Sequence, residues 1–308
     1  MTTRADAGII DEAPSRDGAD RAFALADGGA RCSLWWSSTP RWRDASTGCI
    51  GHFEARDLSS ATTLLRQAAK TLFAAGIVHC LGPLDGSTWR RYRAVIETSV
   101  EPVFAMEPTS PAWWPEAFRG AGFTVAETYH SSLEDPITID DRIETLARRV
   151  RDAGITLVSI DELDDETALD AVFAISRVGF ADNALYTPLA RAEFDAMYRP
   201  LMGRQPHGLA LLARGADDAP LGFLFGLPNL VEPQPCTLIL KSMAIMPSAR
   251  RVGLGTLLIE RCKENARTLG LARCIYALMH DANHSATIAR HHAAVIRRYA
   301  LFARSRGS

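Results

Sequence analysis

The sequence has few of the features that mark membrane, nucleic-acid-binding or disulfide-rich proteins. No run approaches 18 apolar residues, so no membrane-spanning helix is predicted. The net charge of −2 gives no strong field to attract nucleic acid or a membrane surface. The six cysteines have no CxxC spacing, which argues against a zinc site or a disulfide framework and favours reduced thiols in a cytoplasmic protein. Lysine is rare, and the three lysines are Lys70, Lys241 and Lys263.

What remains is the composition of a soluble globular protein. Hydrophobic residues make up 47% of the chain and charged residues 23%. A length of 308 residues is large for a single small domain and favours two domains. The polar and acidic stretch 1–20 has no hydrophobic core, so it does not resemble a secretory signal, and we expect a disordered tail there.

The most informative segment is the glycine loop, residues 250–256, which has the pattern Arg-x-x-Gly-x-Gly. A β-branched and aliphatic run at 237–245 precedes it, and apolar residues at helical spacing follow it as far as Leu269. A second apolar run covers 274–279. Taken alone, the loop fits either an ordinary glycine-rich turn or a phosphate site at a helix N-terminus. The strand–loop–helix–strand context favours the phosphate site.

Two common phosphate-binding motifs are excluded. The dinucleotide-binding fingerprint needs a third glycine, where this chain has Leu258, and an acidic residue at the end of the next strand, where it has Met279 and His280. No Gly-Lys-Ser/Thr sequence of a P-loop is present.

The segment resembles the GNAT superfamily of acyl-CoA-dependent N-acyltransferases. Residues 240–247 match that family's motif strand, residues 250–255 match its Gln/Arg-x-x-Gly-x-Gly/Ala loop, and Asn283 stands where the family has an Asn after the next strand. The resemblance covers roughly residues 154 to 305 and implies acetyl-CoA or another acyl-CoA as cosubstrate, with no metal. It implies that the following residues contact the CoA: Met243, Ala244, Ile245, Arg250, Arg251, Val252, Gly253, Leu254, Gly255, Thr256, Asn283 and Ser285.

The implied chemistry is direct attack of an amine on the thioester, with a main-chain N–H of the motif strand near Met243, Ala244 or Ile245 stabilising the oxyanion. The catalytic acid and base stay unassigned. Arg290 stands where family members commonly have a tyrosine acid. A water relay is one alternative, and the side-chain candidates are Glu232, His284, Ser285, Arg290, His291, His292 and Tyr299.

The N-terminal half repeats this layout in degenerate form. A strand at 47–55, a helix capped by Asp57 and a strand at 77–81 repeat the order of the motif unit. The segment 113–123 resembles the helix-to-Gly-Phe region near the end of many GNAT domains. The loop 55–60 has no glycine and carries the Asp57 carboxylate, so we expect no CoA binding in this half.

Candidate acceptor contacts come from both halves. By resemblance, the region 179–188 covers the acceptor, which makes Asp182, Asn183 and Tyr186 substrate candidates, although a polar interhelical loop fits equally well. In the N-terminal half, Trp89, Tyr92 and Arg93 belong either to an amphipathic surface helix or to an acceptor pocket that faces the other domain. Gly222, Gly226 and Ala244 suggest a small, apolar lining that admits an acyl group longer than acetyl.

The predicted fold class is therefore α/β, with two tandem GNAT-like domains of mixed, mostly antiparallel sheet flanked by helices. The domains are a tail at 1–20, a degenerate domain at 21–135 and an acyl-CoA-binding domain at 136–308. Only one strand, 294–304, follows the last motif where a GNAT domain has two, so either a strand is missing or the N-terminal copy supplies one and fuses the sheets.

The predicted function is transfer of an acyl group, most simply acetyl, to a primary amine of a small molecule. The alternative is a catalytically silent CoA-binding or scaffold protein of the same fold. We expect a cytoplasmic monomer or homodimer that binds neither nucleic acid nor membrane.

Overall fold

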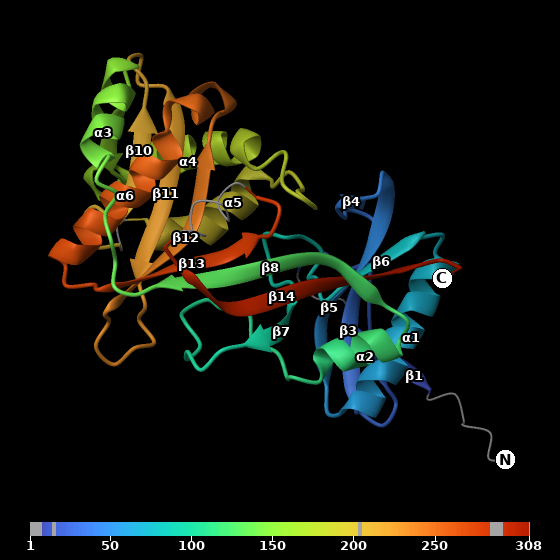
Figure 1. Ribbon diagram of the computed structural model, residues 1–308. Coiled ribbons are helices and arrows are strands. Elements are labelled where there is room, and N and C mark those ends of the chain that lie inside the picture. The colour runs from blue at the N-terminus through green and yellow to red at the C-terminus, as the bar shows by residue number, and fades with distance from the viewer. Residues whose placement is uncertain (1–7, 14–16, 203–204, 284–291, 308) are drawn as a thin grey trace.

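The computed structural model describes residues 8–13, 17–202, 205–283 and 292–307. In this part of the chain fourteen strands form one mixed sheet with helices packed on its faces (Figure 1). The α/β class and the tandem arrangement predicted from the sequence are confirmed.

The N-terminal half contains eight strands and two helices in the described part of the chain. They are β1 (Ile9–Glu12), β2 (Arg21–Leu25), β3 (Ala30–Trp35), β4 (Arg41–Trp42), β5 (Ala45–Ala55), α1 (Leu58–Ala74), β6 (His79–Gly82), β7 (Ala94–Thr98), α2 (Trp114–Gly120) and β8 (Thr124–Glu134).

The C-terminal half contains the remaining elements, including three 3₁₀ turns. They are α3 (Ile143–Asp152), β9 (Thr156–Ser159), η1 (Ile160–Glu162), α4 (Asp165–Gly179), α5 (Arg191–Tyr198), η2 (Arg199–Leu201), β10 (Ala210–Arg214), β11 (Pro220–Pro228), β12 (Thr237–Ile245), η3 (Pro247–Val252), α6 (Leu254–Thr268), β13 (Arg273–His280) and β14 (Ala294–Ser305).

Each half contains one parallel strand pair joined by a crossover helix. In the N-terminal half α1 connects β5 to β6, and in the C-terminal half α6 connects β12 to β13. Parallel neighbours need such a crossover because a short hairpin can join only antiparallel strands. The repeated layout inferred from the sequence is therefore present in the fold.

The two halves exchange their last strands. The final strand β14 pairs with β6, β7 and β8, while β8 from the N-terminal half pairs with β13 (Figure 1). Of the two sequence-based alternatives, the structure has the second one, in which the N-terminal copy supplies a strand and the sheets fuse. The predicted boundary at 135/136 thus separates the sequence repeats but not the sheets.

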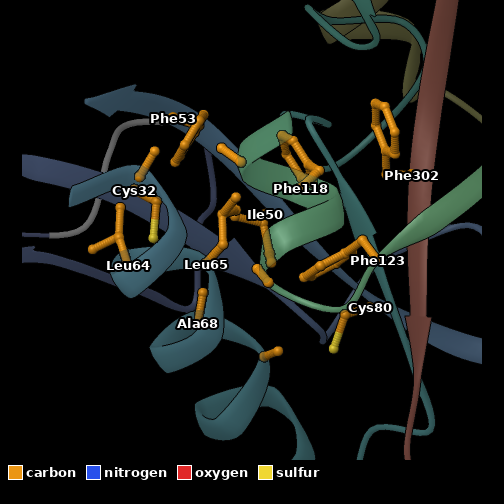
Figure 2. Packing of buried hydrophobic residues seen from close by; sticks show 14 of the residues in the cluster. Cys32, Ile50, Phe53, Leu64, Leu65, Ala68, Cys80, Phe118, Phe123 and Phe302 are labelled. Carbon is orange, nitrogen blue, oxygen red and sulfur yellow. The ribbon is translucent and has the colours of Figure 1, made fainter. Parts of the chain in front are cut away.

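The exchange extends to the hydrophobic cores. Phe302 of β14 is fully buried in the N-terminal core and stacks on Phe118 of α2 at 5.0 Å between ring centroids (Figure 2). In the C-terminal half one core lies between the sheet and helices α3 and α6, and a second lies under α4 and α5. Side chains of β12 pack into both cores, Leu238 and Leu240 into the first and Ala244 into the second.

Two expectations are corrected by the structure. The predicted tail contains β1, which pairs with β2 and packs Ile9 against the N-terminal core. The segment 87–93 forms turns closed by a bridge between Leu84 and Tyr92, and no surface helix. Residues 160–162 form a 3₁₀ turn, and α4 begins after Asp164, whose carboxylate caps the helix by accepting from the N–H of Thr167.

Neither the cysteines nor the helices of the described residues indicate a further function. All six thiols are free and five are buried, and burial raises the pKa of Cys262, which suits packing and not nucleophilic catalysis. No helix in the described ranges combines the length and apolar character needed to span a membrane.

Candidate functional site

The motif strand β12 has a free edge at its C-terminal end. Its antiparallel pairing with β11 continues to Ile245, but its parallel pairing with β13 stops at Leu240, opposite Tyr276. The β11–β12 register shifts at this point, so that Lys241 is an extra, bulged residue. From Lys241 to Ile245 the described structure pairs nothing with the second edge, and an extended ligand can hydrogen-bond there as an added strand.

The glycine loop follows directly and ends at an uncapped helix. Residues 247–252 form a 3₁₀ turn, Gly253 has φ of 86°, and α6 begins at Leu254 without a side-chain cap. A non-glycine residue at such a φ is strained, which explains the glycine at this position. Because the first N–H groups of a helix have no intrahelical acceptor, this end of α6 offers donors and a positive dipole end to an anion.

The corresponding helix of the N-terminal half is closed. Asp57 caps α1 by accepting from the N–H of Ser60 at 2.8 Å. Hydrogen bonds donated by that N–H and by the Ser60 hydroxyl lower the pKa of Asp57, so the cap is a carboxylate at neutral pH. A phosphate at this helix would meet a negative charge where α6 has bare N–H groups.

Side chains of the glycine loop divide into buried and exposed groups. Leu254 is fully buried in the core under α6, so only its backbone can contact a ligand. Arg250 is exposed and lies 3.3 Å from Asp182, which joins a predicted CoA contact to a predicted substrate contact. The carbonyl of Arg251 accepts from Arg149 at 2.9 Å, and this bond fastens the loop to α3.

The predicted lining for a long acyl chain is wrong. A Cβ on Gly222 would lie 2.7 Å from Cδ1 of Ile245, and one on Gly226 would lie 2.7 Å from Sγ of Cys262. These glycines allow β11 to pack tightly against side chains of β12 and α6, and they line no open space. Ala244 is likewise buried, beside Gly179 of α4.

The acceptor candidates of the two halves meet. Trp89 donates its indole N–H to the carbonyl of Thr187 at 2.8 Å and packs edge-on against Tyr186. The ion pair between Arg90 and Glu193, at 2.6 Å, fastens the same two segments. The region 84–93 therefore faces the other half, as one of the sequence-based alternatives had it, although not as a helix.

The other acceptor candidates have different surroundings. Asn183 is exposed in the loop after α4. Tyr92 lies farther along the junction, where its ring packs edge-on against Tyr129 of β8. Asn283 stands in a turn after β13, with its N–H bonded to the carbonyl of His280 at 2.9 Å. Of these, Tyr92 and Asn283 are near the carboxyl end of β13.

Two catalytic candidates are engaged in hydrogen bonds with other residues. Glu232 precedes β12 and accepts hydrogen bonds from Asn229 and from the backbone of Cys236. Burial acts to raise the pKa of Glu232, but hydrogen bonds outweigh it and hold the pKa below its usual value, which suits a turn-stabilising carboxylate. Tyr299 is fully buried in β14 and donates to Glu107, and burial raises its pKa. The contacts of both side chains stabilise the fold and assign neither a catalytic role.

The remaining catalytic candidates, His284, Ser285, Arg290 and His291, lie outside the described residues. His292 is described, and its charge is one of the causes that lower the pKa of Asp140. Sequence reasoning missed two groups near the end of β13. His280 faces Glu127 at 2.9 Å, and Lys241 occupies the bulge of β12. The sequence did carry a clue to Lys241: it is a lone lysine inside an apolar strand of a lysine-poor chain.

Comparison with known proteins agrees with this geometry. Residues 176–292 match the model of the acetyltransferase (GNAT) family. Among curated protein sequences no significant match is found.

Solved structures show likeness over nearly the whole chain. A GCN5-related glucosamine N-acetyltransferase region of a fungal multi-domain GH3 β-N-acetylglucosaminidase is 13% identical, with TM-score 0.57, over 92% of this chain and 33% of that one. A tandem GNAT protein of the clavulanic acid biosynthesis pathway is 12% identical, with TM-score 0.52, over 94% and 83%. A GCN5-related N-acetyltransferase from Sphaerobacter thermophilus is 13% identical, with TM-score 0.50, over 92% and 80%. This chain thus spans about a third of the fungal protein, and the likenesses concern the fold alone.

Proposed function

From the premise that the C-terminal half of this chain belongs to the GNAT acetyltransferase family and that the whole chain has a tandem GNAT fold, we propose that the protein is an acyl-CoA-dependent N-acyltransferase. Its acyl donor is acetyl-CoA or a close relative, and its acceptor is a primary amine of a small molecule. The C-terminal half binds the donor, and the N-terminal half supplies one wall of the acceptor site and the strand β8.

One observation carries the proposal: a free strand edge runs into an uncapped helix N-terminus. The edge from Lys241 to Ile245 suits the amide-rich pantetheine arm, and the N–H groups at the start of α6 suit the pyrophosphate. Arg250 and Arg251 are exposed beside that helix end and add positive charge. In the N-terminal half the carboxylate of Asp57 closes the equivalent position.

The reaction balances without a further reactant. The amine nitrogen bonds to the thioester carbon, the C–S bond breaks, the amine loses a proton and the CoA thiolate gains one. A main-chain N–H of residues 243–245 is the proposed oxyanion donor. We assign no side chain to the proton transfers, for which a water relay suffices. The proposal includes a cytoplasmic protein that works as a monomer or homodimer, without nucleic acid or membrane.

Turnover separates an enzyme from a silent CoA-binding protein. Acetyl-CoA and a panel of small primary amines are incubated with the protein, released thiol is measured, and products are identified by mass spectrometry. We expect amine-dependent thiol release with a product 42 mass units heavier than the amine, as one acetyl group replaces one hydrogen. Acetyl-CoA binding without release of thiol for any amine would instead support the scaffold.

The glycine loop provides a matched pair of variants for this assay. A Cβ on Gly255 would lie 3.6 Å from Cε of Met243, an ordinary contact, so the fold accommodates a side chain there. Gly255→Asp puts a negative charge beside the proposed pyrophosphate, whereas Gly255→Asn has nearly the same shape without the charge. Gly253 is less suitable because its φ of 86° makes any substitution strained.

A further inference from the structure

Arg93 and Lys241 have no carboxylate partner among the described residues, and both lie where β12 and β13 separate: Lys241 follows the last pair, Leu240 with Tyr276, and Arg93 bonds to Leu278 of β13. Arg93 is 7% exposed, donates from Nη1 to the carbonyl of Leu278 at 3.1 Å, and leaves its Nε without a hydrogen-bond acceptor. Lys241 has no hydrogen bond or ion pair among the described residues, and burial, with a further contribution from the charge of Arg93, lowers its pKa. Buried charges in folded proteins are normally paired, so this pair lacks an anion.

The surroundings of Arg93 hold its guanidinium in place. The group lies 3.8 Å from the ring centroid of Tyr92 and 4.3 Å from that of Tyr129. The backbone of Arg93 has φ of 68°, and that of its partner Leu278 has φ of 58°. Such conformations are rare for these residues and persist only where the surroundings enforce them, often at ligand sites. Arg93 also ends the segment 84–93 that docks on the acceptor region of the other half.

The position of Lys241 places it at the point where β12 and β13 separate. It is the first residue beyond the last β12–β13 pair, and it sits in the bulge. Its side chain is partly buried, and burial together with the charge of Arg93 lowers the pKa of Lys241 to about 8. In the proposed enzyme the thioester ends at this same stretch of strand, so an anion bound by Lys241 and Arg93 would lie beside the reacting carbonyl.

Two carboxylates beside the end of β13, Glu127 and Asp281, have other partners. Glu127 lies 2.9 Å from Nε2 of His280 and accepts from the indole of Trp42 at 3.1 Å. Asp281 is bonded to His130 and Thr128. The charge of the two cations is therefore left for a ligand.

Resting on the proposed function, we propose that Lys241 and Arg93 bind the carboxylate of the acceptor, which is therefore an amino acid or another amine that carries a carboxylate. Each half supplies one of the two cations, so the acceptor site is complete only when both halves are present. This assigns a substrate-binding role to the degenerate half, which has no CoA site of its own.

The chain allows a test of this site that does not depend on turnover. Lysines are dimethylated reductively with ¹³C-formaldehyde, and the methyl signals are followed by NMR in the presence of CoA. The chain has only three lysines, of which Lys70 is exposed and Lys263 is 1% exposed within an ion-paired cluster. A Lys241→Arg variant identifies the signal of Lys241.

The probes are N-acetylglycine, N-acetyl-L-alanine and N-acetyl-L-lysine, each compared with its carboxamide. We expect at least one acid to shift the Lys241 methyl signal and to raise its apparent pKa, while the matching amide does neither. If no acid shifts the signal at up to 50 mM (roughly the limit at which a weak millimolar complex is still seen), the anion site is wrong.

Activity gives a second, independent test. The acceptors compared are L-amino acids and their amides. Because an amide cannot make the charge-assisted hydrogen bond to Lys241, kcat/KM should be about 10- to 100-fold higher for the acid than for its amide. In Lys241→Met this ratio should fall towards one, while the exposed-lysine control Lys70→Met keeps it. Equal kcat/KM for acid and amide in the wild type would overturn the inference and leave the acyltransferase intact.

Two other outcomes are also decisive. A fall in kcat of Lys241→Met that is the same for acids and amides would show proton transfer in place of carboxylate binding. If no amine reacts at all, the proposed function fails, and the NMR titration still decides whether the two cations hold a carboxylate.

Discussion

Truncation of Phe302 tests whether the last strand belongs to the N-terminal core. Phe302 is fully buried, stacks on Phe118 with an interplanar angle of 14°, and belongs to the same cluster as the apolar face of α1 (Figure 2). In a chain of two independent halves, a residue six positions from the C-terminus would affect only the C-terminal half. In the exchanged arrangement, Phe302→Ala opens a cavity in the N-terminal half.

The magnitude follows from burial. Removal of a fully buried phenylalanine side chain typically costs about 3–5 kcal/mol of unfolding free energy, which includes the cavity left behind. Val295 on the same strand is 43% exposed, so Val295→Ala should cost about 1 kcal/mol or less. The pair compares the core with the surface of one strand.

Urea denaturation measures the size of the effect, and hydrogen exchange measures its location. We expect Phe302→Ala to reduce the protection of amides in α1 and α2 more than that of amides in α6. A loss below about 1 kcal/mol, or a loss of protection confined to the C-terminal half, would refute the strand exchange.

Three further outcomes follow from particular contacts. Lys263 is buried with its Nζ 3.2 Å from Glu134 and 3.0 Å from Glu260, so Lys263→Met should cost about 3–5 kcal/mol of unfolding free energy in thermal or urea denaturation, because two buried carboxylates lose their cation. Burial acts to raise the pKa of Glu134, but hydrogen bonds and the ammonium of Lys263 hold it below its usual value of 4.5. The carboxylate of Glu134 therefore stabilises the fold above pH 4.5, and this stabilisation is lost as the pH falls through the lower pKa of the folded state. In Glu134→Gln the unfolding free energy, measured in a pH series, should fall less steeply at acid pH. Trp89→Phe leaves the carbonyl of Thr187 without its donor and should lower the unfolding free energy by about 1 kcal/mol, measured by urea denaturation; no change would show that the indole hydrogen bond is not formed in solution.

The local units of the fold could be predicted from the sequence. Helix α1 was located from its spacing and from Asp57, and the unit from β12 to β13 from alternating apolar runs around Gly253 and Gly255. In these segments the signals are short-range: a capping carboxylate, a glycine at positive φ and an apolar stripe lie within a few residues of one another.

The sequence allowed the strand exchange as one of two alternatives, but it did not distinguish the exchange from a missing strand. The apolar pattern of β14 suits any buried strand, and nothing in its residues selects β6 as a partner over β13. The short strand β1 was missed because four residues give little periodicity, and its order comes from pairing with β2.

The parts of the site that are formed by contiguous stretches of backbone could be predicted from the sequence. The glycine loop and the motif strand were found because their residues are contiguous. Arg93 and Lys241 were not joined in advance because their meeting depends on the bulge at Lys241 and on the docking of segment 84–93 against the other half. Those are long-range contacts.

The central claim is that the start of α6 binds the pyrophosphate of an acyl-CoA, and calorimetric titration with acetyl-CoA tests it most directly. We expect one site per chain in the wild type and binding weakened at least about 100-fold in Gly255→Asp, because a carboxylate within about 4–5 Å of a phosphate repels it by several kcal/mol even at an effective dielectric of 20. Gly255→Asn should weaken binding far less. An absence of binding by the wild type, or equal weakening in both variants, would contradict the account.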